Sequence, residues 1–179
     1  MRNEELFDLC KTELIRSNAD KRHPFRRVIL STIDEYPESR VVIKRKSKQD
    51  FSQIIFTDSR TPKVQHLKAN PKSTLLFYHD KKMLQIRMKG SCEIVSEGKE
   101  YDEYRASLNG RTSDYQTLLT PGSILNGNDI HYDDAMHFVV IQFVPQEIDV
   151  LHLNREGHQR IRIIESKHRR MDKIENLVP

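Results

Sequence analysis

The sequence predicts an α+β fold, a mainly antiparallel β-barrel with a few peripheral helices. Two observations support this prediction. Short runs rich in β-branched and aromatic residues recur along the chain and are separated by turn residues. Only a few segments show the apolar spacing of a helix. Several short antiparallel strands with few helices are typical of such a barrel.

The chain is predicted to begin with an amphipathic helix over residues 3–16. Its apolar side chains recur at helical spacing, and they are Leu6, Phe7, Cys10, Leu14 and Ile15. Residues 18–24 break this pattern. We therefore interpret residues 1–23 as an N-terminal helix and linker that cap the rest of the fold.

The predicted strands are short runs of β-type residues at 27–33, 40–45, 51–57, 73–78, 83–95, 137–144, 148–153, 159–164 and 174–178. The first two are joined by a hairpin loop that contains Asp34 and Pro37. The long run at 83–95 contains Gly90, and a glycine inside a strand predicts a bend or bulge there.

Two further helices and one long loop complete the predicted elements. Pro62 follows the hydroxyl residue Thr61, which is a helix start signal, and Asn70-Pro71 ends that helix. Residues 98–108 are also predicted to be helical. Residues 109–134 are irregular, and a loop of this length in a small domain is usually functional or poorly ordered.

Length and composition predict a single domain over residues 1–179. A chain of 179 residues has no room for a second independent core. Hydrophobic residues make up 36% and charged residues 31% of the chain, which predicts a thin core and favours oligomerisation. Disorder is the competing interpretation of this composition, and the regular apolar runs argue against it.

The charge and the cysteines narrow the class of protein. A net charge of +4, spread along the chain, does not by itself indicate nucleic acid but suits an anionic ligand. Cys10 and Cys92 are too few for a disulfide framework or a cysteine metal site. Acidic residues near the N-terminus argue against a signal peptide, and no apolar run could cross a membrane, so we expect a cytoplasmic protein.

The chemically most informative segment runs from the strand at 40–45 to the helix that starts after Thr61. Hydroxyl groups, basic side chains and free amides at a helix N-terminus attract phosphate. Lys63 in the first turn is unfavourable for the helix dipole, and a bound anion would remove that conflict. The alternative interpretation of this segment alone is an ordinary capped helix with solvated charges.

The order of features from Arg40 to Gly90 resembles the pyridoxamine 5'-phosphate oxidase family, and specifically its smaller FMN-binding relatives. The matching residues are Arg40 and Arg45, Thr57, Thr61 and Lys63, Asn70-Pro71, Leu75-Leu76-Phe77, and Gln85 with Gly90. The segment His158-Gln159-Arg160 and the ending Leu177-Val178-Pro179 resemble the last strands of that family. The resemblance therefore covers most of the chain from about Pro24 onward.

The resemblance implies a split β-barrel that binds FMN between the two subunits of a homodimer. It implies that FMN is bound by Arg40, Thr61 and Lys63 at its phosphate with Arg60 as a helper, by Val41, Val42, Ile43 and Thr57 beside the flavin, and by Gln85 at its polar edge. Arg160 would reach the flavin from the partner subunit.

The implied activity is that of an FMN-dependent oxidoreductase. His158 and Arg45 would orient a small organic substrate, and hydride would pass between that substrate and the flavin. Oxygen or a nicotinamide nucleotide would be the other redox partner.

Departures from the family pattern bear on the activity. Glu156 stands two residues before His158, where a phosphate-binding Arg would be, and Leu108 falls near the place of another. Leu151 replaces the tryptophan beside the flavin. A buried carboxylate at the first position would repel a substrate phosphate. The sequence thus supports the FMN site better than the vitamin-related activity.

Two other functions stay open at this point, a flavin-binding protein without turnover and a basic β-barrel that binds nucleic acid. His131 and His137 flank two aspartates, but we expect a loop and a strand start there rather than a metal site. The basic residues at 167–170 are interpreted as a solvated hairpin tip.

Overall fold

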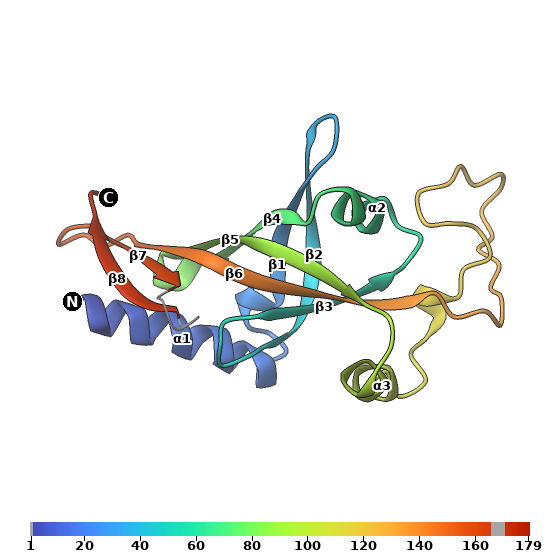
Figure 1. Ribbon diagram of the computed structural model, residues 1–179, viewed down its shortest axis with the longest axis horizontal. Coiled ribbons are helices and arrows are strands. Elements are labelled where there is room, and N and C mark those ends of the chain that lie inside the picture. Colours follow the sequence, from blue (N-terminus) through green and yellow to red (C-terminus); the bar gives the residue numbers. More distant parts are fainter. Residues whose placement is uncertain (1, 166–170) are drawn as a thin grey trace.

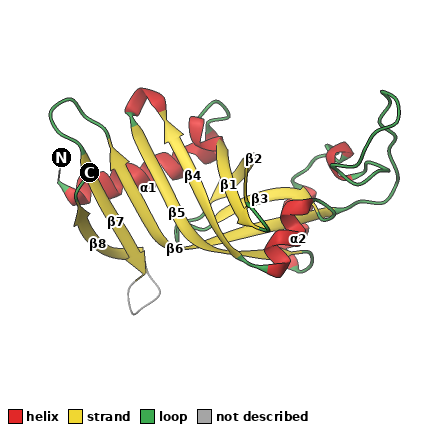
Figure 2. Ribbon diagram, turned by 90° about the horizontal axis from the view of Figure 1, so that it is seen from above, coloured by secondary structure: helices red, strands yellow, loops and turns green. Residues whose placement is uncertain are grey.

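The computed structural model describes residues 2–165 and 171–179, so the predicted hairpin tip at 167–170 lies outside the described residues. The strands form one antiparallel sheet in the order β3-β2-β1-β4-β5-β6-β7-β8. A further pairing of β3 with β6 closes the first six strands of that order into a barrel, and β7 and β8 extend it as a ribbon (Figure 2). The predicted α+β antiparallel barrel is confirmed.

The strands are β1 (Arg27–Ile33), β2 (Pro37–Ser47), β3 (Gln53–Asp58), β4 (Lys72–His79), β5 (Leu84–Val95), β6 (Phe138–His152), β7 (Gln159–Glu165) and β8 (Met171–Leu177). The α-helices are α1 (Asn3–Ala19), α2 (Pro62–Ala69) and α3 (Lys99–Ala106). In Figure 1, α2 and the long loop after α3 gather at one end of the molecule, whereas both termini lie at the other.

The barrel interior is filled by alternate residues of the strands, because successive side chains of a strand point to opposite faces. On β1, Val28 and Leu30 are buried while Ile29 between them is exposed. The residues of this core are mainly aliphatic and aromatic, and those on barrel strands include Leu75, Phe77, Ile86, Met88, Phe143, Ile148 and Val150. Ile161 and Ile163 extend the core onto β7. Their burial is the main driving force that holds the strands together.

Strand β6 differs from the prediction of two separate strands at 137–144 and 148–153. It continues through Pro145 without a break. The pairing with β5 shifts between Lys89 and Gly90, which confirms the predicted bulge and sets Gly90 opposite Pro145. A bulge is one of the few places inside a sheet that tolerates a proline. Gly90 is required because a Cβ there would collide with the carbonyl oxygen of Val144.

Helix α1 packs against β2, β6 and β7 and buries the predicted apolar stripe, including Leu6, Cys10 and Leu14. The helix ends three residues later than the prediction, at Ala19. Its last turn contacts a lysine of β2, which fixes the helix to the barrel by polar bonds as well as by apolar contacts.

That lysine is Lys44, whose side chain lies inside the barrel and is fully buried. Its Nζ donates to the hydroxyls of Ser17 at 2.5 Å and Ser47 at 2.9 Å, and to Oδ1 of Asn18 at 3.2 Å. Burial lowers the pKa of Lys44 to about 7. The oxygen atoms around the ammonium group take the place of water at the contact between α1 and β2.

The loop after α3 is irregular, as predicted. It contains a short 3-10 helix at Ser113–Tyr115 and an isolated bridge between Thr117 and Tyr132. Tyr115 packs edge-on against Phe138 and ties the loop to the start of β6. In the part of the chain that the structure describes, no helix is long and apolar enough to span a membrane.

Candidate functional site

A cavity of about 300 Å³ lies where β2, β3 and the start of α2 meet. Antiparallel pairing places β2 beside β3, and the chain turns directly from the end of β3 into α2. The cavity brings together many of the residues predicted for the site, namely Val41, Val42, Ile43, Arg45, Thr57, Thr61 and Lys63.

The start of α2 presents donors to this cavity. Nζ of Lys63 donates to the hydroxyl of Thr57 at 3.0 Å, and the hydroxyl of Thr61 lies 3.5 Å from that of Thr57. Thr61 precedes the helix, but no side chain caps the amides of its first turn, and that turn holds no acidic residue. The amides of Val64 and Gln65 donate to the carbonyl oxygen of Thr61, and the positive end of the helix dipole favours a bound anion there.

Arg40 of β2 places a second positive charge near Lys63. Its guanidinium donates to the hydroxyl of Thr32 at 2.7 Å, and its nearest carboxylate is that of the half-exposed Glu38 at 3.7 Å. Burial lowers the pKa of Lys63, and the charge of Arg40 lowers it further. Burial also lowers the pKa of Arg40. The buried carboxylate of Asp58 also lines the cavity and raises the pKa of Lys63, but its ion pair is with Arg60. Two partly buried cations that disfavour each other, and that form no ion pair with a buried carboxylate among the described residues, suit an anionic ligand.

Arg60, the predicted helper at the phosphate, already has partners in the chain. Its Nε and Nη2 donate to the carboxylate of Asp58 at 3.0 and 2.7 Å, and Nη2 also donates to the carbonyl oxygen of Thr117 at 2.8 Å. It lines a separate open cavity beside Asp34 and His66. Arg60 therefore ties the long loop to the end of β3.

The other two predicted cofactor residues lie on a different part of the sheet. Gln85 of β5 pairs with Leu151 of β6, which in turn pairs with Arg160 of β7. Directly paired residues point to the same face, so these three side chains form one row across three strands. None of them lines the cavity beside Lys63.

Asp149, which the sequence analysis did not single out, holds Arg160. Nε of Arg160 donates to Oδ1 at 3.0 Å and Nη2 donates to Oδ2 at 2.7 Å, while Nη2 of Arg87 donates to Oδ2 at 2.7 Å. Asp149 is 4% exposed. Its partner Arg87 lies 62 residues away on β5, so no local pattern could have indicated the contact of both arginines with Asp149.

The predicted substrate residue His158 lies in the exposed turn between β6 and β7, together with Glu156. Its Nδ1 accepts the backbone N–H of Asn154 at 3.3 Å. Gly157 between His158 and Glu156 has a φ of 131°, a value that favours glycine.

The predicted substrate residue Arg45 lies at the border between the cavity beside Lys63 and a larger one of about 840 Å³. Its guanidinium lies 5.3 Å from the ring centre of Phe56, and that ring is 5.5 Å from the ring of Tyr104. The two cavities also share Tyr115 and Asp114.

The larger cavity is strongly basic. Four cationic side chains line it, and they are Lys21, Arg45, Lys46 and Arg111. Asp114 is its only acidic lining residue. Among residues 2–165 and 171–179, none of the four cations forms a salt bridge. A cavity with aromatic walls and several unpaired cations suits a planar anion.

Residues 8–96 match the family described as "Pyridoxamine 5'-phosphate oxidase, FMN-binding domain". This chain belongs to the pyridoxamine 5'-phosphate oxidase-related FMN-binding family. FMN is accordingly the cofactor of the domain that residues 8–96 match. The matched segment contains β2, β3 and α2, and thus the cavity beside Lys63.

Proteins from several bacteria are similar to the chain in sequence or in fold. A pyridoxine/pyridoxamine 5'-phosphate oxidase from Legionella pneumophila (strain Lens) is 26% identical over 161 residues, 74% of each chain. A pyridoxamine 5'-phosphate oxidase-related, FMN binding protein from Nostoc punctiforme superposes with a TM-score of 0.71 at 18% identity over 96% of each chain. PhzG from Burkholderia lata, in complex with tetrahydrophenazine-1-carboxylic acid, superposes with a TM-score of 0.76 at 16% identity over 97% of this chain and 92% of its own.

The residues beside Lys63 fit the cofactor of the pyridoxamine 5'-phosphate oxidase-related family. FMN ends in a phosphate group, which is doubly charged when ionised. Arg40 and Lys63 have no buried carboxylate partner among the described residues, and each has a lowered pKa. A phosphate between them would supply the missing negative charge.

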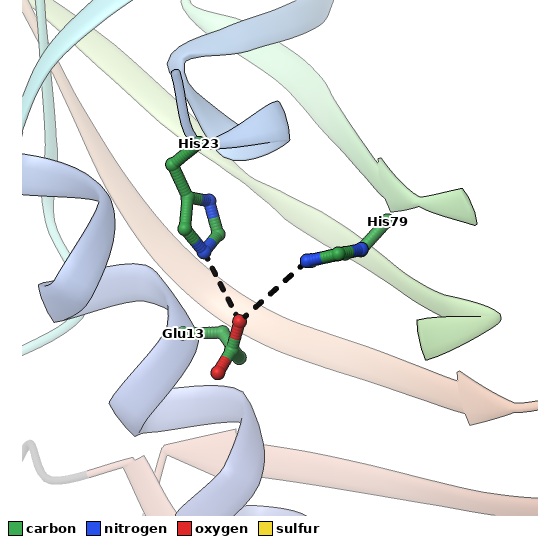
Figure 3. Close-up of side chains that lie close together, drawn as sticks. All are labelled: Glu13, His23 and His79. Carbon is green, nitrogen blue, oxygen red and sulfur yellow. Dashed lines mark hydrogen bonds and ion pairs between the residues drawn. The ribbon is translucent and has the colours of Figure 1, made fainter. Parts of the chain in front are cut away.

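The segment matched by the family also contains a buried charge cluster that sequence reasoning missed. Glu13 of α1 meets His23 and His79 from two other segments (Figure 3). Oε2 of Glu13 lies 3.0 Å from Nε2 of His23 and 3.9 Å from Nε2 of His79. Nζ of Lys82 donates to Oε1 at 2.6 Å. Glu13 and His23 lie far from His79 and Lys82 in the sequence, so no spacing pattern could have indicated the cluster.

This Glu13 cluster does not suit a metal ion in the geometry that the chain adopts. Nδ1 of His23 accepts the backbone N–H of Phe25 at 3.1 Å, so the neutral ring carries its proton on Nε2 and donates to Glu13. The other carboxylate oxygen already binds the Lys82 ammonium. The cluster is therefore a matched set of charges that joins α1 to the barrel.

Proposed function

We propose that this protein is an FMN-dependent oxidoreductase that transfers hydride between a small organic substrate and the flavin. The observation that carries the proposal is the pair of unmatched cations, Arg40 and Lys63, beside the hydroxyls of Thr57 and Thr61. The family match supports the cofactor, and the basic aromatic cavity next to it supports a substrate.

In this proposal the phosphate of FMN binds Arg40, Thr61 and Lys63. Arg40 and Lys63 donate charge-assisted hydrogen bonds to the phosphate, and such bonds are stronger than those between neutral groups. Thr61 adds a hydroxyl at the start of α2, where the helix dipole favours an anion. The backbone of residues 41–43 and the side chain of Thr57, which line the same cavity, would border the flavin. Arg60 acts indirectly, since its guanidinium holds Asp58 and the long loop.

The second half of the cofactor site comes from a second copy of the chain. Gln85 and Arg160 lie in a row on β5–β7, away from the cavity beside Lys63. The outer face of the barrel also exposes Ile29, Val41 and Tyr78. Exposed apolar side chains on one face favour association. A homodimer would cover them and bring Arg160 of one protomer to the cavity of the other.

The substrate in this proposal is a planar organic anion in the larger cavity. Arg45 at the border of the two cavities orients it toward the flavin, and the Phe56 and Tyr104 rings provide a flat apolar wall. Lys21, Lys46 and Arg111 attract its charge. His158 reaches the substrate from the partner subunit, and Glu156 beside it disfavours a phosphate at that end.

The cofactor supplies the redox chemistry when bound, and the side chains of the chain supply position and charge. Arg45 holds the substrate anion against the Phe56 ring, and Tyr115 and the long loop limit the access of water to the border between the cavities. Gln85 and Arg160 donate hydrogen bonds to the polar edge of the ring system.

The experiment that tests this proposal is the visible spectrum of the purified protein, with mass identification of what denaturation releases. A two-band flavin spectrum with FMN released supports the cofactor site. A colourless protein that does not bind added FMN contradicts it. Steady-state turnover is then assayed with the amine and aldehyde forms of the pyridoxamine vitamin, with phenazine carboxylates and with nicotinamide nucleotides. A protein that binds FMN but turns over none of these compounds is a flavin-binding protein without catalytic activity.

A further inference from the structure

We propose that Asp149 is a positioning residue that aims Arg160 at the flavin and limits the positive charge there. The inference rests on the proposed function, because it takes Arg160 as a flavin contact of the partner subunit. It assigns a role to Asp149, which lies on the same face of the sheet as Leu151 and two residues before it on β6.

The contact between Asp149 and Arg160 fixes the orientation of the guanidinium. Nε and Nη2 of Arg160 bind the two carboxylate oxygens at 3.0 and 2.7 Å, and this two-point contact holds the plane of the group. Among the described residues, Nη1 of Arg160 forms no hydrogen bond. One edge of the guanidinium is therefore held by the protein, and Nη1 remains available for a ligand.

Arg87 contributes to the net charge of the cluster that it forms with Asp149 and Arg160. It approaches Asp149 from β5, on the opposite side from β7, and its Nη2 donates to Oδ2 at 2.7 Å. Two guanidinium groups and one carboxylate leave a net charge of one positive unit. Burial alone would raise the pKa of Asp149, but the hydrogen bonds and charges of Arg160 and Arg87 lower it below its ordinary value, so the carboxylate stays ionised.

This arrangement has two separable effects on bound FMN. Holding Arg160 in one orientation strengthens cofactor binding, because less side-chain freedom is lost when the ligand arrives. The carboxylate also offsets one positive charge near the ring system. Since positive charge favours the reduced flavin, Asp149 makes the bound FMN harder to reduce.

The test compares four variants with the wild-type holoprotein. Asp149→Asn removes the charge, Asp149→Glu keeps it but displaces the carboxylate by one methylene, and Arg87→Gln with Asp149→Asn restores the net charge of one positive unit. Glu147→Gln is the matched control, since Glu147 lies on the same face of β6 two residues earlier and pairs with Lys89 at 2.8 Å. Two readouts are measured for each, the FMN dissociation constant by flavin fluorescence and the midpoint potential by titration against a reference dye.

We expect Asp149→Asn to raise the FMN dissociation constant on the order of tenfold, as the loss of a fixed charge-assisted bond would. At a fixed potential its ratio of reduced to oxidised FMN should rise on the order of tenfold, because one negative charge is lost nearby. The double variant should return the potential to the wild-type value while binding stays weak. Asp149→Glu should weaken binding without moving the potential, and Glu147→Gln should change neither readout.

If the folded Asp149→Asn variant has the FMN dissociation constant and the midpoint potential of the wild type, the inference is wrong and the proposed function is unaffected. If Asp149→Asn does not fold, Asp149→Glu decides, because wild-type FMN affinity in that variant contradicts the positioning role. A wild-type protein that binds no FMN is a different result, which contradicts the proposed function and the inference with it.

Discussion

Two charged side chains of the protein are shielded from water but differ in their partners. Glu13 lies at the contact between α1 and the barrel, and Lys63 lies at the start of α2. Glu13 is 2% exposed and is matched by Lys82 and His23. Lys63 has a hydroxyl partner, and the cation Arg40 affects its pKa more strongly than the carboxylate of Asp58, which is paired with Arg60. The charges of the first region are paired within the chain, whereas Lys63 forms no ion pair among the described residues.

The pKa directions express the same difference. At Glu13, burial would raise the pKa, but hydrogen bonds from Lys82 and His23 lower it, so the charged form is stabilised by folding. At Lys63, burial lowers the pKa and Arg40 lowers it further, so folding disfavours the charged form. A matched charge stabilises the fold, whereas an unmatched one is available to a ligand.

The largest expected effect is on cofactor binding. Replacing Arg40 and Lys63 together by Ala removes two charge-assisted contacts to phosphate and should weaken FMN binding by at least about 100-fold. Isothermal titration with FMN measures this. The matched control replaces Lys68 and Lys72 by Ala, because both are exposed and nearby and carry the same total charge. Equal FMN affinity in the two double variants would contradict the assigned phosphate site.

The next effect concerns stability. Glu13→Gln leaves His23 and Lys82 without their carboxylate, and removal of one partner from a buried pair costs about 3 kcal/mol in the free energy of unfolding. Urea unfolding of the apoprotein measures it. Asp8→Asn on the exposed side of the same helix serves as control and should cost under about 0.5 kcal/mol. FMN affinity should stay unchanged in both variants, and a parallel loss of FMN binding would show that the two regions are coupled.

The dependence on pH sharpens the comparison. Because the pKa of Glu13 is lowered from 4.5 in the folded state, its contribution to stability is fully present above 4.5 and is lost as the pH falls through the folded value. The difference in unfolding free energy between wild type and Glu13→Gln should therefore shrink as the pH falls below about 4.5. A difference that stays constant to pH 3 would contradict the assigned charge of Glu13.

The smallest expected effect is an increase in the stability of the apoprotein. Lys63→Met removes a charge that burial and Arg40 disfavour, so the apoprotein should become more stable by about 0.5 kcal/mol even as FMN binding weakens. Thermal unfolding with and without FMN measures both effects. Lys68→Met, on the same helix and exposed, should leave FMN binding as it is. A less stable Lys63→Met apoprotein would mean that Lys63 is matched within the chain after all.

The parts that could be predicted from the sequence are those encoded by neighbouring residues. The barrel strands follow from local β-type runs, and the start of α2 follows from Thr61-Pro62. Thr57, Thr61 and Lys63 lie within one short segment, so their shared cavity needed no long-range information. The roles of these residues stay predictions.

The parts that could not be predicted depend on pairings between distant strands. The sequence predicted two strands at 137–144 and 148–153, and the bulge at Gly90 on the neighbouring strand explains why β6 continues through Pro145. The roles of Asp149 and Glu13 depend on contacts with Arg87 and Lys82, which are distant in the sequence. Arg60 was predicted as a helper at the phosphate, and its contact with Thr117 could not be foreseen because Thr117 lies 57 residues away in the long loop.

Strand β6 has one more consequence, since its two halves serve different neighbours. Its first half pairs with β3 and closes the barrel beside the cavity, while its second half pairs with β7 and carries the row of Arg160. In the proposed dimer, each protomer contacts the partner's cofactor through Arg160 on β7 and its own cofactor through the cavity beside β2. Two differently damaged copies, one defective at Lys63 and one at Arg160, would complement each other, because their mixed pair retains one intact site. Inherited defects on the two sides of this strand would then behave as if they belonged to separate genes.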